Sequence, residues 1–181
     1  MKILKRENSN GSKPIKTLCA AFLLRILGLA LAAASKIDKE IREEIALLPD
    51  GCLIGMTVFP FDRPGFKMPA MFVQKTSENR FRYIGSRTDN RNFDFLITFT
   101  SLEAALRVLT FRESTLKAHA RNRFTIKGAL ITAAPFSRIL NKTEILLLPK
   151  VIAARAVRRY DKPKKKHRKR ICLYARIFTG I

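Results

Sequence analysis

The chain has 181 residues and a formal net charge of +22, from 36 Lys and Arg against 14 Asp and Glu. Apolar residues make up 47%, enough for one hydrophobic core and too many for a disordered polycation. Three scattered cysteines and two distant histidines predict neither a disulfide framework nor a zinc site, and the sequence has no phosphate-binding glycine loop and no nucleophile elbow, so we expect no metal and no other cofactor.

The positive charge is concentrated at the two ends. Residues 1–16 carry a net +4 and residues 150–181 a net +11, which leaves +7 for the long middle. We therefore expect a basic leader over 1–16, an apolar helix over 17–35, a globular domain over 36–160 and a basic tail over 161–181.

The apolar segment Leu18–Ala34 is interrupted only by Arg25 and Gly28 and ends in three alanines. A basic leader before such a segment, and small residues after it, are typical of a secretory signal. Seventeen residues are at the lower limit for crossing a bilayer of ~30 Å, and Arg25 disfavours burial in lipid. A signal or anchor, an interfacial helix and a helix packed in the core remain open as alternatives.

The next segments predict one helix and then strands. A capping box with Ser35 as N-cap and Asp38 three residues later opens a helix that ends at Pro49–Gly51. Its apolar stripe is Ile37, Ile41, Ile45 and Leu48. Strands are expected over Cys52–Phe59, Ala70–Lys75, Arg80–Gly85 and Phe93–Phe99, the last with Phe93, Phe95, Ile97 and Phe99 on one face.

The second half predicts helices around one more strand. Thr100–Glu103 forms a capping box before a helix with the stripe Leu102, Ala105, Leu106 and Leu109, and Ser114–Ala120 forms a short helix. Arg123–Leu130 alternates as a strand with Phe124 and Ile126 inward. Later elements are a helix with Pro135 in its first turn and Phe136, Ile139 and Leu140 inward, the apolar Glu144–Pro149, and a helix with Val151, Ala154 and Val157 on one face. This order predicts an α+β fold: a mostly antiparallel sheet with helices packed on one face.

From about Asn92 to Arg158 the sequence resembles the lipid-carrier domain of the sterol carrier protein type-two family. The matching segments are Phe93–Phe99 with Thr100–Leu106, Ala120–Gly128, Asn141–Ile145 and Leu148–Lys150. The bacterial accessory lipid carriers of quinone biosynthesis are the nearest analogy. Ala129 is a departure, because an Asp commonly follows the glycine at this point in the family.

The resemblance implies a five-stranded sheet covered by helices that enclose an apolar tunnel for a lipid tail, and a carrier that is not an enzyme. The ligand is expected to be an isoprenoid, a quinone precursor, a sterol-like molecule or an acyl chain. For each single residue a place in the plain core is the simpler interpretation. The candidate lipid-binding residues are Phe95, Ile97, Phe99, Leu102, Leu106, Leu109, Phe124, Ile126, Phe136, Ile139 and Leu140.

The basic tail predicts an anionic membrane surface as a partner, in a cytoplasmic protein peripheral to the membrane and acting alone or with a biosynthetic enzyme complex. Like charges favour an extended, solvated run over 162–170. Its candidate contacts are Lys162, Lys164, Lys165, Lys166, Arg168, Lys169 and Arg170. Apolar residues beside it are expected to enter the interface: Ile171, Leu173, Tyr174, Ile177 and Phe178.

Two other classes of function stay open. The same basic run is typical of nucleic-acid contact, although no aromatic residue interrupts it before Tyr174 and the middle carries no RNA-binding signature. An enzyme is the third alternative, with His119 and Glu113, or Asp94 near Thr98, as acid–base pairs. Isolated histidines and strand carboxylates are more often structural, so no catalytic residue is assigned.

Overall fold

The computed structural model describes residues 13–60, 68–86, 93–147 and 166–179. Five strands and six helices cover most of them. In chain order they are α1 (Lys13–Ile37), α2 (Lys39–Ala46), β1 (Leu53–Val58), β2 (Ala70–Lys75), β3 (Phe81–Gly85), β4 (Phe95–Phe99), α3 (Leu102–Leu109), α4 (Thr115–Ala120), β5 (Phe124–Gly128), α5 (Leu130–Leu147) and α7 (Lys166–Thr179). The helix expected over Val151–Val157 lies outside these ranges.

The strands form one mixed sheet in the order β3-β2-β1-β4-β5. β1 pairs with β2, β2 with β3 and β4 with β5 in antiparallel fashion, but β1 and β4 at the centre are parallel. The expectation of a mostly antiparallel sheet is therefore wrong. The reason is topological: β2 and β3 turn back on one side of β1, and the chain then crosses to the other side, where β4 runs in the direction of β1.

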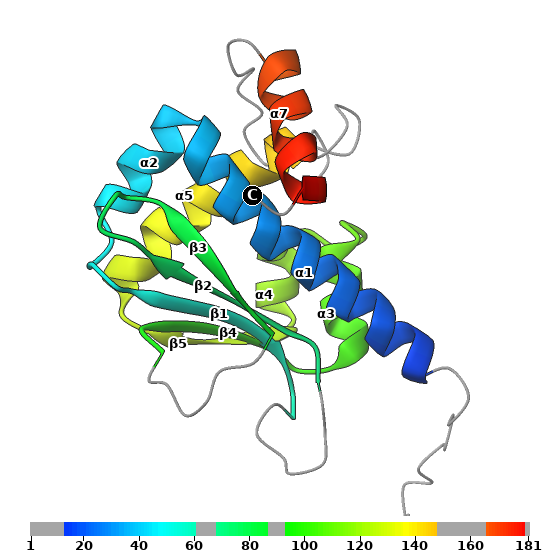
Figure 1. The fold of residues 1–181 in the computed structure, drawn as a ribbon. Helices are drawn as coiled ribbons and strands as arrows, with labels where there is room; N and C mark the ends of the chain where they lie inside the picture. The colour runs from blue at the N-terminus through cyan, green and yellow to red at the C-terminus, as the bar shows by residue number, and fades with distance from the viewer. Residues whose placement is uncertain (1–12, 61–67, 87–92, 148–165, 180–181) are drawn as a thin grey trace, which may run out of the picture.

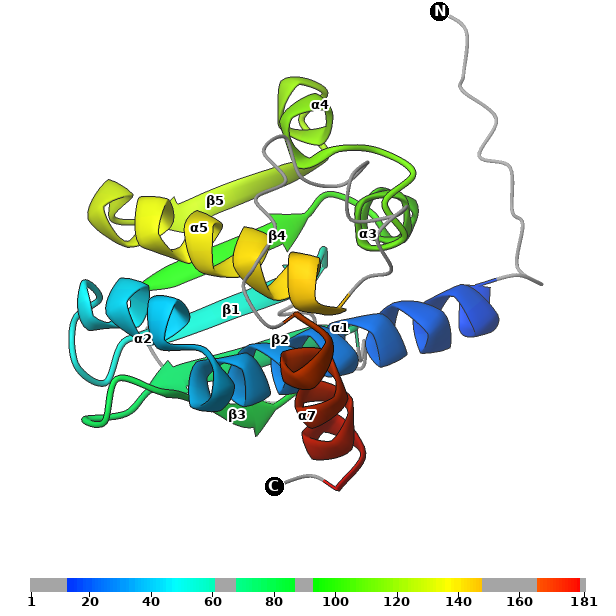
Figure 2. The same ribbon diagram turned by 90° about the horizontal axis from the view of Figure 1, so that it is seen from above.

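One face of the sheet carries the core. The strand register places Ile54, Met56 and Val58 on the same face as Phe95, Ile97 and Phe99, and all six are buried. Figure 1 and Figure 2 show α1, α2 and α5 lying over one face of the sheet, with α3 and α4 toward one end. The molecule is thus a two-layer α+β structure with its apolar layer between sheet and helices.

Phe93 does not share the face of Phe95. Its ring stacks on Phe72 with centroids 5.2 Å apart, and Phe72 pairs with Gly55, on the face away from the core cluster. The alternation begins only at β4, because Asp94 is used in a side-chain contact, its Oδ2 accepting a hydrogen bond from the Leu53 amide at 2.8 Å. A side chain at Gly55 would lie 2.6 Å from the Phe72 ring, so a glycine is required there.

Helix α1 is packed on the sheet along its second half. Leu24, Leu31 and Ala34 are fully buried, and Leu27 is 8% exposed. Gly28 permits the closest approach, because a Cβ there would lie 2.6 Å from the Tyr83 ring on β3. Residues 24–34 therefore belong to the same packed unit as the sheet.

Two helix starts lie one or more residues away from the expected caps. α1 continues through Ser35, whose Oγ donates to the Ala32 carbonyl and accepts from the Phe81 amide, so Asp38 caps α2 instead. In α3 the cap is Ser101, because its hydroxyl and not that of Thr100 accepts from the Ala104 amide. Both capping-box predictions were wrong in register because neighbouring Ser, Thr and Asp residues are equally suited to capping.

Pro135 is not in the first turn of its helix. α5 begins at Leu130, five residues earlier, and Pro135 is inside it. A proline in this position removes one backbone donor, which the longer helix tolerates because Phe136 and Ile139 are almost fully buried beneath it. The strand β5 before it ends at Gly128, two residues before the end expected at Leu130.

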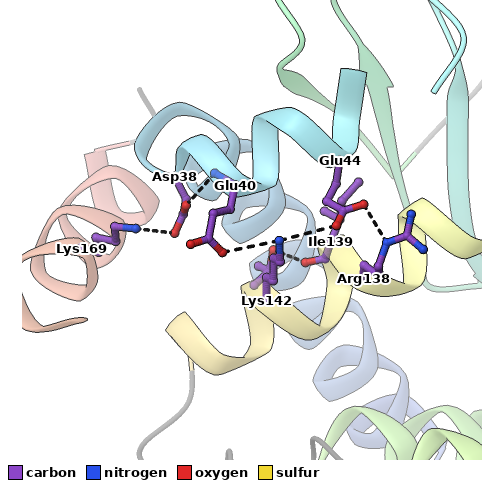
Figure 3. A network of polar contacts seen from close by, with 8 residues as sticks. Asp38, Glu40, Glu44, Arg138, Ile139, Lys142 and Lys169 are labelled. Atoms are coloured by element: carbon purple, nitrogen blue, oxygen red, sulfur yellow. Dashed lines mark hydrogen bonds and ion pairs between the residues drawn. The ribbon is translucent and has the colours of Figure 1, made fainter. Parts of the chain in front are cut away.

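A polar network joins α2, α5 and α7 (Figure 3). Glu44 pairs with Arg138 at 2.7 Å, and Lys142 lies 3.5–3.6 Å from Glu40 and Glu44. Asp38 is 8% exposed in its side chain and pairs with Lys169 of α7 at 2.8 Å. The α2 cap is therefore also the anchor of the carboxy-terminal helix.

The basic tail is helical from Lys166 onward. The extended conformation expected for 162–170 is wrong for residues 166–170, which begin α7. The expectation for Leu173 is also wrong, because this side chain is fully buried among core residues, whereas Ile171 is 70% exposed. Packing of one apolar face on α1 and α5 offsets the repulsion between the lysines and arginines.

Leu31→Ala should lower the free energy of unfolding by about 2–5 kcal/mol, because it removes a fully buried side chain from the α1–sheet contact. The measurement is urea denaturation followed by circular dichroism. Leu18→Ala on the same helix is the control, since that side chain is 72% exposed and its loss should change stability by less than about 0.5 kcal/mol. Equal effects of the two substitutions would contradict the packing of α1 on the sheet.

Candidate functional site

An apolar cavity of about 130 Å³ lies between the sheet, α1, α3 and α5. Twelve of its fourteen lining residues are apolar. They are Leu23, Ile26, Leu27, Met56, Ile97, Phe99, Val108, Leu109, Phe111, Phe124, Leu140 and Leu147; the two polar ones are Thr115 and Glu144. A wall of this composition suits an apolar ligand with few polar groups.

The candidate lipid-binding residues are distributed over three environments. Ile97, Phe99, Leu109, Phe124 and Leu140 line the cavity. Three others are core residues with at most 2% exposure: Phe95, Phe136 and Ile139. Of the rest, Leu102 packs against the core and Leu106 lines an outer groove between α1 and α3. The expectation that Ile126 faces inward is wrong: its side chain is 45% exposed on β5, an edge strand of the sheet.

The contribution of α1 to this wall was not predicted from the sequence. Leu23, Ile26 and Leu27 line the cavity, and they lie in the segment whose location was left open. The helical spacing of these three residues was the available signal, but it has meaning only once α1 is known to cover the sheet. Met56, Val108 and Phe111 were likewise not among the candidates.

The cavity is small for a lipid tail. Its volume compares with an engineered apolar cavity of about 150 Å³ that accommodates benzene, whereas pockets for larger ligands span about 300–1,000 Å³. An enclosed tunnel is therefore not shown among the described residues. A longer chain would require the surrounding helices to separate.

Phe111, in the connection between α3 and α4, has a strained backbone. Its φ is 58°, a left-handed conformation that bulky residues rarely adopt, and its side chain lines the cavity. Such strain is maintained only where the surroundings demand it. The connection places this ring in the cavity wall at a conformational cost.

Glu144 is the ionisable group of the cavity wall. Burial among apolar neighbours raises the pKa of its carboxyl from 4.5 to about 7. Burial is the whole cause, because no charged neighbour contributes to the shift. Between pH 4.5 and about 7, Glu144 is therefore mainly a neutral carboxylic acid in the folded protein and mainly a carboxylate in the unfolded chain.

The acid–base pairs considered for an enzyme are engaged otherwise. Glu113 is buried and lies 3.0 Å from Arg121 and 3.5 Å from Arg123. Asp94 accepts the Leu53 amide, and the ring of His119 lies against Phe124 with centroids 5.6 Å apart. All three side chains therefore make contacts that stabilise the fold.

The amino-terminal half of α1 carries an exposed apolar surface. Ile15, Leu18 and Phe22 are 68%, 72% and 62% exposed and recur at helical spacing. Figure 2 shows this end of α1 extending beyond α3. A groove of about 580 Å³ follows it, lined by Ile15 and Phe22 and by the basic Lys16, Arg107 and Arg112, among others. Leu23 belongs to both this groove and the cavity.

By length and composition, one helix in the described ranges is apolar enough to cross a membrane. It spans Pro14–Ile37; its most apolar 18-residue window has a mean hydropathy of 2.1, and 44% of that window is buried within the protein. A core helix fulfils the same criterion, and the packing of Leu24, Leu27 and Leu31 on the sheet is of that kind.

The predicted polyanion contacts are only partly within the described structure. Lys162, Lys164 and Lys165 lie outside it, and Lys166, Arg168 and Arg170 are described in their helical backbone alone. Lys169 is paired with Asp38 inside the protein. The charge of Lys169 is therefore engaged in an ion pair between α7 and the start of α2.

No protein-family model matches this sequence, and no curated protein matches it. Among solved structures, the chain is similar to a UbiJ-SCP2 ubiquinone synthesis protein (15% identity, TM-score 0.44, covering 72% of this chain and all of the other). It is also similar to sterol carrier protein 2 from Yarrowia lipolytica in its apo form (13%, 0.46, covering 70% and 93%).

A third similar structure is a conserved hypothetical protein from Thermus thermophilus, described as possibly a sterol carrier protein (22% identity, TM-score 0.40, covering 75% of this chain and 89% of the other). Identities of 13–22% with TM-scores below 0.5 assign no ligand and no activity to this chain.

The free energy of unfolding should fall as the pH rises from 4.5 through 7, by up to about 3 kcal/mol, because folding raises the pKa of Glu144 and the folded state binds the extra proton. In Glu144→Gln this part of the pH dependence should disappear. Urea denaturation at half-unit pH intervals measures it. Glu103→Gln, at an exposed position paired with Lys16, should retain the decline above pH 5. A Glu144→Gln profile parallel to that of the wild type would contradict the assignment.

Proposed function

We propose that this protein is a non-catalytic carrier that holds an apolar molecule in the cavity between its sheet and helices. The observation that carries the proposal is the composition of the wall, with twelve apolar side chains from the sheet, α1, α3, α5 and the Phe111 connection. Burial of the ligand supplies the driving force, about 0.8 kcal/mol for each CH₂ group. The polar groups of the wall are too few for a hydrophilic substrate.

The ligand class is proposed from the sequence resemblance: an isoprenoid, a quinone precursor, a sterol-like molecule or an acyl chain. A role as accessory factor in quinone biosynthesis, beside a biosynthetic enzyme complex, is proposed on the same basis. For a ligand of this length the cavity must enlarge, and the strained Phe111 connection is the place where a change of backbone conformation would relieve strain.

We propose further that the carrier works at an anionic membrane surface in the cytoplasm, and that the first turns of α1 make the contact. Ile15, Leu18 and Phe22 are exposed there beside a groove that contains Arg107 and Arg112, and also Lys16, which pairs with Glu103. Apolar side chains flanked by cations are suited to the headgroup region of an anionic bilayer. The membrane contact is thus proposed for this surface and not for the tail, because Lys169 pairs with Asp38 and Leu173 is buried in the core.

Native mass spectrometry with lipid extraction, on protein purified from its own cells, should find an apolar lipid bound to the wild type. Val108→Phe, which fills the cavity, should lose this lipid, whereas Leu106→Phe on the same helix should keep it, because Leu106 lines the outer groove. Both variants need to retain the circular dichroism spectrum of the wild type. Lipid-free wild-type protein that also takes up no apolar fluorescent probe would contradict the carrier proposal.

Binding to vesicles that contain phosphatidylglycerol should fall about tenfold or more in the double variant Leu18→Asp, Phe22→Asp. Each substitution removes an apolar side chain whose full burial is worth ~1.5–3 kcal/mol, and each adds a negative charge. Cosedimentation measures it. Ile131→Asp on α5 is the matched control, at 73% exposure but away from α1. Wild-type binding should weaken as salt is raised. Vesicle binding that survives in the double variant and disappears in the triple variant Lys162→Gln, Lys164→Gln, Lys165→Gln would assign the membrane contact to the tail instead.

A further inference from the structure

Among the described residues, Glu144 is the one ionisable side chain in a wall that is otherwise almost wholly apolar. From α1 the wall contains Leu23, Ile26 and Leu27, and from α3 Val108 and Leu109. The sheet contributes Met56, Ile97, Phe99 and Phe124, and the other lining residue with a polar side chain is Thr115. The carboxyl of Glu144 therefore meets the cavity without a charged neighbour in the described lining.

The carboxyl also has no hydrogen bond or ion pair within the described part of the chain. The cations of α5 are directed elsewhere: Arg138 pairs with Glu44, and Lys142 lies near Glu40 and Glu44. Lys142 is two residues from Glu144, a spacing at which helical side chains do not face one another. The Glu144 side chain is half-buried, and its oxygens are not among the fully buried polar atoms that lack a partner in the described residues. The carboxyl is therefore accessible at the cavity wall, where it can donate to or accept from a polar group of a ligand.

We propose that Glu144 binds the polar end of the carried molecule, and that this end is an uncharged oxygen function, a hydroxyl or a carbonyl, on an otherwise apolar body. This inference rests on the proposed carrier function and names the class of its ligand. A neutral carboxylic acid donates to a carbonyl oxygen and accepts from a hydroxyl, so one side chain serves both kinds of oxygen. A purely hydrocarbon ligand would leave the group unpaired, and a fully charged ligand would lose its hydration to an apolar wall.

Two probes of nearly equal shape test the proposal on the full chain: p-xylene, which has no polar group, and p-cresol, which has one hydroxyl. Both are close to the benzene size that a cavity of this volume accommodates. Affinities are measured by NMR titration at pH 6 for the wild type, Glu144→Gln and Glu144→Leu. Gln keeps a donor and an acceptor at nearly the same shape, and Leu removes both.

In Glu144→Leu the affinity for p-cresol relative to p-xylene should fall at least about fivefold, and in Glu144→Gln it should stay within about twofold of the wild type. An unchanged ratio in all three proteins would overturn the assignment of Glu144 while leaving the carrier function intact. Tighter binding of 4-methylbenzylamine than of p-cresol, lost in both variants, would overturn the uncharged class in favour of a cation. If p-xylene binds neither the wild type nor Glu144→Leu, the carrier function itself fails, and this inference fails with it.

Discussion

The contact of α1 with the sheet is the interaction on which the other parts depend. The sheet has one strongly apolar face, and α1 contacts β2, β3, α2, α3, α5 and α7. Gly28 lets the helix approach the Tyr83 ring, and Ser35 at its end accepts the Phe81 amide of the same edge strand. Both sets of contacts hold the helix in one register along the sheet. The cavity wall, the outer groove and the site for α7 are all defined by where α1 lies.

Local patterns were sufficient for much of the fold. β2 was predicted to the residue, and β1, β3, α4 and β5 within one or two residues, because apolar alternation and capping are properties of neighbouring residues. The parallel pairing of β1 with β4 was not predictable in this way, since it depends on how the chain crosses between distant strands. The role of 18–34 was undecided for a related reason: a core helix and a membrane helix have the same composition, and only the partner distinguishes them.

The same contrast between local patterns and long-range packing explains which residues of the site were predicted from the sequence. Ile97, Phe99 and Phe124 follow from strand alternation, but Leu23 and Leu27 require the position of α1. Glu144 stood in the sequence as a single acid in an apolar run, a pattern that a solvated helix end also gives. What gives it chemical meaning is the three-dimensional absence of a counter-ion among the described residues, with burial raising the pKa of the carboxyl to about 7. Electrostatic environment is the feature least accessible to sequence patterns.

The order of α1 before every strand of the sheet has a consequence for biosynthesis. Leu24, Leu27 and Leu31 are made before any strand that covers them, and β3, whose Tyr83 packs on Gly28, follows more than forty residues later. At translation rates of about 5–20 residues per second, this apolar helix waits several seconds without its sheet. During that interval the nascent chain presents the same surface as a membrane-directed segment. The apolar surface of α1 is therefore covered only after the sheet has been synthesised and has formed.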